Sequence, residues 1–185
     1  MILALKSTIF KAQVSISDMD RGYYAEHALT LARHPSETDE RMMVRLLAFV
    51  LFANERLEFG KGLSSVDEPD LALTDYGGQI QLWIEVGLPD TRAVKRALSR
   101  ASEVVVLAYG AQAARMWLDR EGPVLRTLAG VRVLMITPDE STALAALCQR
   151  SMQLQFTIQD GDVWLTSDGE SLHLHPETQL TTPRT

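Results

Sequence analysis

The spacing of hydrophobic and polar residues divides the chain into predicted strands and helices. Ile9, Val14 and Ile16 alternate with polar residues, which is typical of a strand with one buried face. Residues 104–109 are apolar without alternation, which indicates a strand covered on both faces. The predicted strands span residues 3–17, 23–33 (a helix being the alternative), 59–63, 71–75, 79–86, 104–109, 131–136, 153–159, 163–166 and 172–175. The predicted helices span residues 36–54, 90–102, 111–119 or further, and 141–150.

The turn and capping residues between these elements predict their order and connections. Ser36 is the expected N-cap of the first helix, because a proline precedes it and Asp39 follows three residues later. Tyr76-Gly77-Gly78 is a hairpin turn between two strands. From Ser36 onward the order is a helix, a three-strand antiparallel meander, a helix and a strand, with further strands at both ends. This order predicts an α/β fold with a mixed sheet.

Length and composition limit the classes of protein to which this sequence can belong. The 185 residues predict a single domain, with residues 176–185 as a flexible tail. No apolar run approaches the roughly 20 residues of a membrane-spanning helix, and the first residues lack the features of a secretion signal. The lone Cys148 lies in an apolar stretch and is predicted to be a core residue. A monomeric cytoplasmic protein without membrane contact is the resulting expectation.

The net charge of −6 limits contact with nucleic acid. Proteins that contact a phosphate backbone widely are usually basic, because each contact releases counterions. Any contact with nucleic acid is therefore expected to be local. In the helix of residues 90–102, Arg92, Arg96 and Arg100 recur every four residues beside Lys95, opposite an apolar side. This basic face predicts phosphate contacts by Arg92, Lys95 and Arg96, although such a stripe is more often simply solvated.

Two carboxylates are expected to meet on the hairpin. A tight turn at Tyr76 to Gly78 sets a register in which Asp70 and Glu85 leave the same face of the sheet, within roughly 5–8 Å. Trp83 shares this face. Two carboxylates so close repel each other unless a cation lies between them or one of them holds a proton. Mg²⁺ or Mn²⁺ suits such oxygen ligands best.

The preceding helix offers a third carboxylate. On a helical wheel Glu40 falls at the edge of the buried face, whereas Arg41 and Arg45 fall on the solvent side. A carboxylate at that edge needs a partner, which a metal shared with Asp70 and Glu85 would supply. A helix-stabilising role without any ligand is an equal alternative for Glu40. Glu37 is explained by its place in the first turn.

These residues resemble two related groups of proteins. The pair Pro69-Asp70, the run Glu85-Val86-Gly87 on the next strand and a glutamate in the preceding helix resemble the PD-(D/E)XK nuclease superfamily. The stretches His34 to Thr38, Asp67 to Asp70 and Trp83 to Asp90 resemble the bacterial YaeQ family more closely, and this likeness covers nearly the whole chain. It implies a compact variant of the restriction-endonuclease-like core.

The resemblance also implies roles for individual residues. Asp70, Glu85 and the Val86 carbonyl would hold the metal, with Glu40 as the helix acid. Gly87 stands where the superfamily has its catalytic lysine, and Lys95 of the following helix is the candidate replacement. An active enzyme would hydrolyse phosphodiesters with Asp70, Glu85 and Lys95 as catalytic residues and Mg²⁺ or Mn²⁺ as cofactor.

Two functions therefore remain open. One is a metal-dependent nuclease or phosphodiesterase. The other is a non-catalytic module of the same fold that binds nucleic acid or a protein partner, which the missing lysine and the acidic net charge favour. Outside this region, His173 and His175 alternate on the last predicted strand and form either a two-ligand metal pattern or a partly exposed strand face, the latter being favoured.

Overall fold

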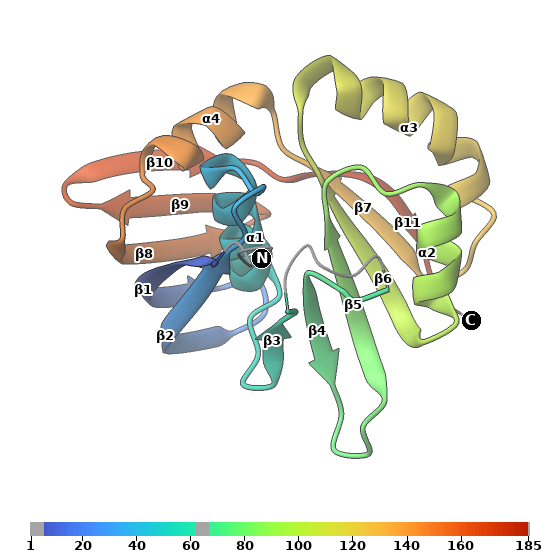
Figure 1. Ribbon diagram of the computed structural model, residues 1–185, viewed down its shortest axis with the longest axis horizontal. Coiled ribbons are helices and arrows are strands. Elements are labelled where there is room, and N and C mark those ends of the chain that lie inside the picture. Colours follow the sequence, from blue (N-terminus) through green and yellow to red (C-terminus); the bar gives the residue numbers. More distant parts are fainter. Residues whose placement is uncertain (1–5, 62–66, 185) are drawn as a thin grey trace, which may run out of the picture.

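Two sheets form the frame of the molecule (Figure 1). A computed structural model describes residues 6–61 and 67–184. The first sheet has the strand order β10-β9-β8-β1-β2 and the second β11-β7-β6-β5-β4-β3. The single mixed sheet expected from the sequence is therefore replaced by two. The terminal strands do not simply flank the central ones, because β1, β2 and β8–β10 pair with one another.

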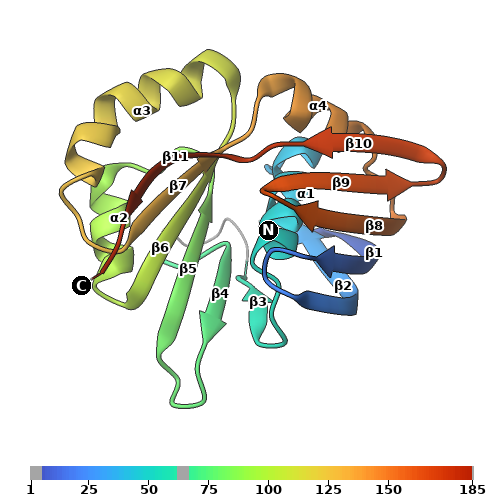
Figure 2. The same cartoon turned by 180° about the vertical axis from the view of Figure 1, so that it is seen from behind.

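The first sheet joins the two N-terminal strands to β8, β9 and β10 from late in the chain (Figure 2). β1 pairs antiparallel with β2 in a hairpin and parallel with β8, so that Lys11 lies opposite Ser151. β8, β9 and β10 then form an antiparallel meander. The strands of this sheet are β1 (Thr8–Asp18), β2 (Tyr23–Arg33), β8 (Ser151–Gln159), β9 (Asp162–Ser167) and β10 (Glu170–Leu174).

The second sheet is mixed and carries the predicted hairpin. β3, β4 and β5 form an antiparallel meander, and β5, β6 and β7 run parallel. Antiparallel β11 closes the far edge beside β7. The strands are β3 (Leu57–Phe59), β4 (Leu71–Thr74), β5 (Ile80–Val86), β6 (Ala101–Ala108), β7 (Val131–Met135) and β11 (Glu177–Thr182).

The helix α1 (Asp39–Leu51) lies between the two sheets (Figure 1). It packs against α4 (Pro138–Ala146) and contacts β2, β4 and β5. Every residue from Met42 to Val50 is buried. One hydrophobic cluster therefore runs from the first sheet through α1 to the near face of the second.

The other face of the second sheet is covered by α2 (Thr91–Leu98) and α3 (Ala111–Leu125). Trp83 of β5 and Trp117 of α3 belong to a second hydrophobic cluster there. Strand β5 therefore separates the two cores, since its side chains alternate between them.

Several sequence expectations require correction. The N-cap of α1 is Thr38, whose hydroxyl accepts the Arg41 N–H at 3.1 Å, whereas Ser36 bonds to His34. Residues 177–182 form strand β11 rather than a frayed tail, because their backbone pairs with β7. Residues 23–33 form a strand and not the alternative helix. Parts of the strands expected at 3–17 and 59–63 lie outside the described residues.

Two smaller expectations concern Cys148 and the membrane. Cys148 is partly buried against the main core, and burial raises the pKa of its thiol to about 11. A thiol in that state is a poor nucleophile near neutral pH, in agreement with a packing role. None of the described helices is long and apolar enough to cross a membrane.

Candidate functional site

The register of the β4–β5 hairpin brings Asp70 and Glu85 together. Leu71 faces Ile84 and Ala72 faces Trp83, so Asp70 and Glu85 are the next residues of the two segments beyond the last regular pair. The Asp70 N–H donates to the Ile84 carbonyl at 3.0 Å, one residue out of this register, so the regular ladder ends at Leu71. The two carboxylates lie within electrostatic range of each other, because the charge of Asp70 contributes to raising the pKa of Glu85. They lie at the carboxyl end of β5, the edge at which open α/β sheets usually bind ligands.

The carboxylate of Asp70 is buried and fully engaged. Its oxygens accept two hydrogen bonds from Arg41 Nη2, at 2.7 and 2.9 Å, and one from the Val86 N–H at 2.7 Å. The same Arg41 nitrogen donates to the Val86 carbonyl oxygen at 3.2 Å. The guanidinium of Arg41 therefore lies where the Asp70 carboxylate and the Val86 carbonyl converge.

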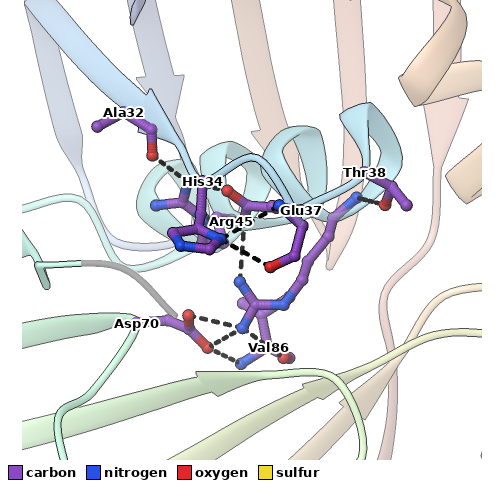
Figure 3. Close-up of polar contacts among 9 residues, drawn as sticks. Ala32, His34, Glu37, Thr38, Arg45, Asp70 and Val86 are labelled. Atoms are coloured by element: carbon purple, nitrogen blue, oxygen red, sulfur yellow. Dashed lines mark hydrogen bonds and ion pairs between the residues drawn. The ribbon is translucent and has the colours of Figure 1, made fainter. Parts of the chain in front are cut away.

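A second carboxylate, Glu37, holds Arg41 from the other side (Figure 3). Glu37 Oε1 accepts from Arg41 Nη1 at 3.0 Å, and both Glu37 oxygens accept from Arg45, at 2.6 and 2.8 Å. Arg45 also donates to the Ala32 carbonyl of β2. A chain of charges from Arg45 through Glu37 and Arg41 to Asp70 thus links the two sheets across the start of α1.

Burial and charge act in opposite directions on Arg41. Burial by itself would lower the pKa of the guanidinium, but the charges and hydrogen bonds of Asp70 and Glu37 outweigh it and raise this pKa. Arg41 is consequently a permanent cation. Its predicted position on the solvent side of the helix is wrong, and so is that of Arg45, which is 2% exposed. The cause is that α1 is enclosed by two sheets and has no solvent side in this part.

Glu85 is the member of the site whose proton affinity departs most from the ordinary value. Burial raises the pKa of Glu85 to about 7, and the nearby charge of Asp70 adds to this effect. The hydrogen bond from Trp83 Nε1 to Glu85 Oε1, at 2.6 Å, and the charge of Arg41 lower it in part. Glu85 is thus divided between its acid and its carboxylate form near neutral pH.

Tyr109, which follows β6, lies within electrostatic range of the same charges. Burial raises the pKa of its hydroxyl; Arg41 opposes that rise, and the carboxylates of Glu40, Glu37 and Asp70 reinforce it. The phenol therefore stays protonated at neutral pH and is available as a hydrogen-bond donor.

Glu40 does not join the other two predicted metal ligands. Its Oε1 accepts a hydrogen bond at 2.6 Å from the hydroxyl of Ser141, a buried residue of α4. Among residues 6–61 and 67–184, no three Asp, Glu, His or Cys side chains are arranged to hold one metal ion. The ligand set expected from the sequence does not fit a metal in this arrangement, because Arg41 lies between Asp70 and Val86 and Glu40 is bound to α4.

Comparison with known proteins assigns the chain to a family. A family model described as YaeQ protein matches residues 3–176. The chain belongs to the YaeQ family. It is 45% identical over 179 residues to "Uncharacterized protein YaeQ" of Salmonella typhi, covering 97% of each chain. It is 43% identical over 173 residues to the protein of the same name from Escherichia coli K12, covering 94% of this chain and 96% of that one.

Solved YaeQ structures share the fold. The crystal structure of the YaeQ protein from Xanthomonas axonopodis pv. citri matches with a TM-score of 0.92 and 49% identity, over 96% of this chain and 99% of that one. The YaeQ protein of Pseudomonas syringae matches with a TM-score of 0.90 and 36% identity, over 94% and 96%. The two-sheet architecture is therefore that of YaeQ proteins.

The basic residues predicted on α2 lie at the surface of this YaeQ chain. Arg92, Lys95 and Arg96 are exposed, while Val94 and Ala97 on the opposite side are buried. Lys95 forms no ion pair with Asp70 or Glu85, and Gly87 has a φ of 119° in the loop before α2. Among residues 6–61 and 67–184, no lysine forms an ion pair with Asp70 or Glu85.

Arg100 connects the basic face with the site through one aromatic ring. Its guanidinium carbon lies 5.0 Å from the centre of the Trp83 ring, and the Trp83 N–H bonds to Glu85. A cation stacked on an indole is stabilised by the ring quadrupole. A line of contacts through the buried Trp83 ring thus links Arg100 to Glu85.

Sequence reasoning missed the cationic part of the YaeQ site. Glu37, Arg41 and Arg45 recur at intervals of four, the spacing that pairs an acid with a following base on one helix face. That signal was present, but the helical wheel assigned the arginines to solvent. Tyr109 and Ser141 carried no comparable signal, since both meet the site only through the tertiary fold.

The two histidines of β10 and the following loop share a carboxylate that the sequence analysis did not name. Asp162 Oδ1 lies 2.7 Å from His173 Nε2 and 2.8 Å from His175 Nδ1. The hydrogen bonds from these rings lower the pKa of Asp162. Both histidines are exposed, which agrees with the partly exposed strand face that was favoured for them.

Proposed function

We propose that this YaeQ-family protein is a non-catalytic member of the PD-(D/E)XK type that binds nucleic acid through the basic face of α2. The observation that carries the proposal is the position of Arg41, whose guanidinium lies between the Asp70 carboxylate and the Val86 carbonyl. The resemblance assigns that position to a catalytic metal. A side-chain cation there supplies the positive charge but no bound water to attack a phosphodiester.

The order of elements supports the assignment to this fold type. From α1 the chain runs through the β3–β5 meander to α2 and β6, which is the helix, meander, helix and strand sequence of the expected core. Asp70 directly precedes the second meander strand, and Glu85 lies on the third. Function does not follow from the fold alone, and it is therefore argued from the residues.

A missing general base supports the non-catalytic alternative. Gly87 offers no side chain at the position of the usual lysine, and Lys95 is exposed on α2 without an ion pair to either acid. General-base assistance is worth roughly 10²–10⁴ in rate. Without it and without a metal, hydrolysis has neither of its two main sources of acceleration.

The exposed cations of α2 supply the binding surface. Arg92, Lys95 and Arg96 follow one another on a helix whose opposite side is buried, and Arg100 extends them toward Trp83. Guanidinium and ammonium groups bind phosphate oxygens with charge-assisted hydrogen bonds. The net charge of −6 confines this contact to a short stretch of backbone.

Fluorescence anisotropy with labelled oligonucleotides tests the proposal. We compare the double variant Arg92→Ala/Lys95→Ala with the control Lys11→Ala/Arg150→Ala. The control removes the same charge from β1 and from the residue that precedes β8. We expect the α2 variant to weaken binding about five- to thirtyfold and the control to change it less than twofold, since two lost phosphate contacts cost about 1–2 kcal/mol. Equal losses in both variants, or no binding by the wild type, would overturn the proposed surface.

A parallel cleavage assay tests the non-catalytic assignment. We expect wild-type protein with Mg²⁺ or Mn²⁺ to leave single-stranded and double-stranded DNA and RNA intact. Metal-dependent cleavage that disappears in Glu85→Gln would contradict the proposal and favour the nuclease alternative.

A further inference from the structure

A groove lies on the second sheet beyond the C-terminal end of α1. It has a volume of about 740 Å³ and crosses the amino ends of β5, β6 and β7. Five strands contribute side chains to one face of it, namely Leu73, Leu82, Glu103, Arg132, Thr178 and Thr181. A volume of this size is within the range of small-molecule sites.

Strand register places these side chains on the face of the sheet opposite to α2. Leu73 pairs with Leu82, which pairs with Glu103 in turn. Thr181 of β11 pairs with Arg132 of β7. Both leucines pack with the hydrophobic cluster around α1, whereas the buried residues of α2 belong to the cluster on the other face. The groove is therefore separate from the basic face of α2.

The guanidinium of Arg132 is held in the groove by two neighbours. Its Nε donates to Glu103 Oε1 at 2.9 Å, and its Nη2 contacts the same oxygen. The ring centre of Phe52, the C-cap residue of α1, lies 5.3 Å from the guanidinium carbon. Among the residues that the structure describes, none accepts a hydrogen bond from Arg132 Nη1, and 35% of this side chain is exposed. Nη1 is thus available to donate to a ligand.

A second arginine lines the groove just after β11. Arg184 Nη1 donates to the carbonyls of Ala101 and Ser102, at 3.0 and 2.9 Å. The charged residues that line the groove are Arg132, Arg184 and Glu103. The groove therefore has an excess of positive charge, although the chain as a whole has a net charge of −6.

We infer that this groove binds a small organic anion with an apolar body and one carboxylate or phosphate head. The head accepts hydrogen bonds from Arg132 Nη1, since guanidinium groups bind both kinds of oxyanion with charge-assisted hydrogen bonds. The body lies on Leu82, which is buried, and on Leu73, which is half-buried. The inference is independent of the proposed function, because the groove and α2 lie on opposite faces of the sheet.

Titration with 8-anilinonaphthalene-1-sulfonate, an aromatic anion whose fluorescence rises on binding, tests the site. We expect saturable binding of about one probe per wild-type chain. Arg132→Gln should weaken it about tenfold or more, because a charge-assisted hydrogen bond is lost. Arg150→Gln is the matched control, since the Arg150 guanidinium also lies 5.3 Å from a phenylalanine ring, that of Phe10, but outside the groove. It should leave the affinity unchanged.

A second variant fills the groove and keeps Arg132. Thr181 is exposed, so Thr181→Trp adds a large side chain without entering the core. We expect this variant to lose probe binding while its circular-dichroism spectrum and Tm stay as in the wild type.

Competition against the probe identifies the head group. Octanoate and octyl phosphate should both displace it, and the tighter of the two names the preferred head. Octanol lacks the charge and inorganic phosphate lacks the apolar body, so each should compete about tenfold more weakly or less.

The inference fails if the wild type does not bind the probe, if both groove variants bind it as the wild type does, or if octanol competes as well as octanoate. It also fails if sedimentation velocity shows a wild-type dimer that Thr181→Trp dissociates, since a second copy of the chain would then occupy the groove. Arg92→Ala/Lys95→Ala should bind the probe normally, so failure of this site and failure of the proposed nucleic-acid surface are distinguishable.

Discussion

At the scale of single residues, Arg41 and Glu85 differ in how their charges depend on pH. Arg41 is a fixed cation held by Asp70 and Glu37, whereas Glu85 changes its charge near neutral pH because burial raises its pKa to about 7. The net charge of the site therefore depends on pH through Glu85. Asp70 and Arg41 form the constant part of the arrangement.

The raised pKa of Glu85 predicts how stability varies with pH. Between about pH 4.5 and 7 the folded chain holds a proton on Glu85 that the unfolded chain has released, so the free energy of unfolding falls as pH rises through this window. We expect Glu85→Gln, which keeps an acceptor for Trp83, to be about 2–3 kcal/mol more stable than wild type at pH 8. Near pH 4.5 the two proteins should differ little.

Urea unfolding at a series of pH values between 4.5 and 8.5 measures this difference. Gln79→Ala, a change in the exposed part of the same hairpin, serves as the control and should show a constant offset from wild type. A Glu85→Gln offset that is equally constant would mean that Glu85 does not carry the raised pKa.

At the scale of elements, the close approach of the backbone beside Asp70 fixes the carboxylate. Gly60, which follows β3, donates its N–H to the Asp70 carbonyl at 2.8 Å. A Cβ atom at Gly60 would lie 1.9 Å from the Pro69 carbonyl oxygen, far inside van der Waals contact. Only glycine allows the two segments to come this near, so Gly60 positions Asp70 without touching Arg41.

Gly60→Ala is therefore expected to push β3 away from the start of β4. Overpacking against backbone of this kind costs about 3 kcal/mol, and the shift should also disturb the Asp70–Arg41 pair. Gly77→Ala in the exposed hairpin is the control, because its Cβ would meet only the Asp75 side chain, at 3.3 Å. We expect the control to change stability by less than about 1 kcal/mol in denaturant unfolding. Similar effects at both positions would contradict the close-contact argument.

The accuracy of the sequence predictions also differs from one element to another. The hairpin turn at Tyr76 to Gly78 was predictable from its residues, but the turn alone did not fix the register, because an irregularity between Leu73 and Thr74 shifts the pairing farther along the strands. The environment of α1 was not predictable in the same way. A helical wheel assumes that one face of the helix is exposed to solvent. In this fold the first sheet covers the side of α1 that the wheel assigned to solvent. That sheet forms through pairing of β1 with β8, which is distant in sequence.

At the scale of the whole molecule, a local basic face belongs to a protein with an acidic net charge. Four cations on or beside α2 lie exposed in a chain whose net charge is −6. We therefore expect long-range attraction of nucleic acid to be weak and the proposed binding to depend on short-range contacts. Screening by salt should act on these few contacts directly.

The salt dependence of oligonucleotide binding checks this distribution of charge. For about four phosphate contacts, a plot of log K against log salt should be linear with a slope of about −3 to −4. Anisotropy titrations between low and physiological salt measure this slope for the wild type. A slope of twice that size would indicate a wider interface than the basic face of α2 provides.

The parallel pairing of β1 with β8 has a consequence for synthesis of the chain. The β1–β2 hairpin leaves the ribosome first, but the other edge of β1 has no partner until Ser151 and the residues after it have emerged. Strands β3 to β7 all lie between these two points in the sequence and can pair earlier. We therefore expect the first sheet to be completed late, with an open strand edge that is a target for chaperones in the meantime.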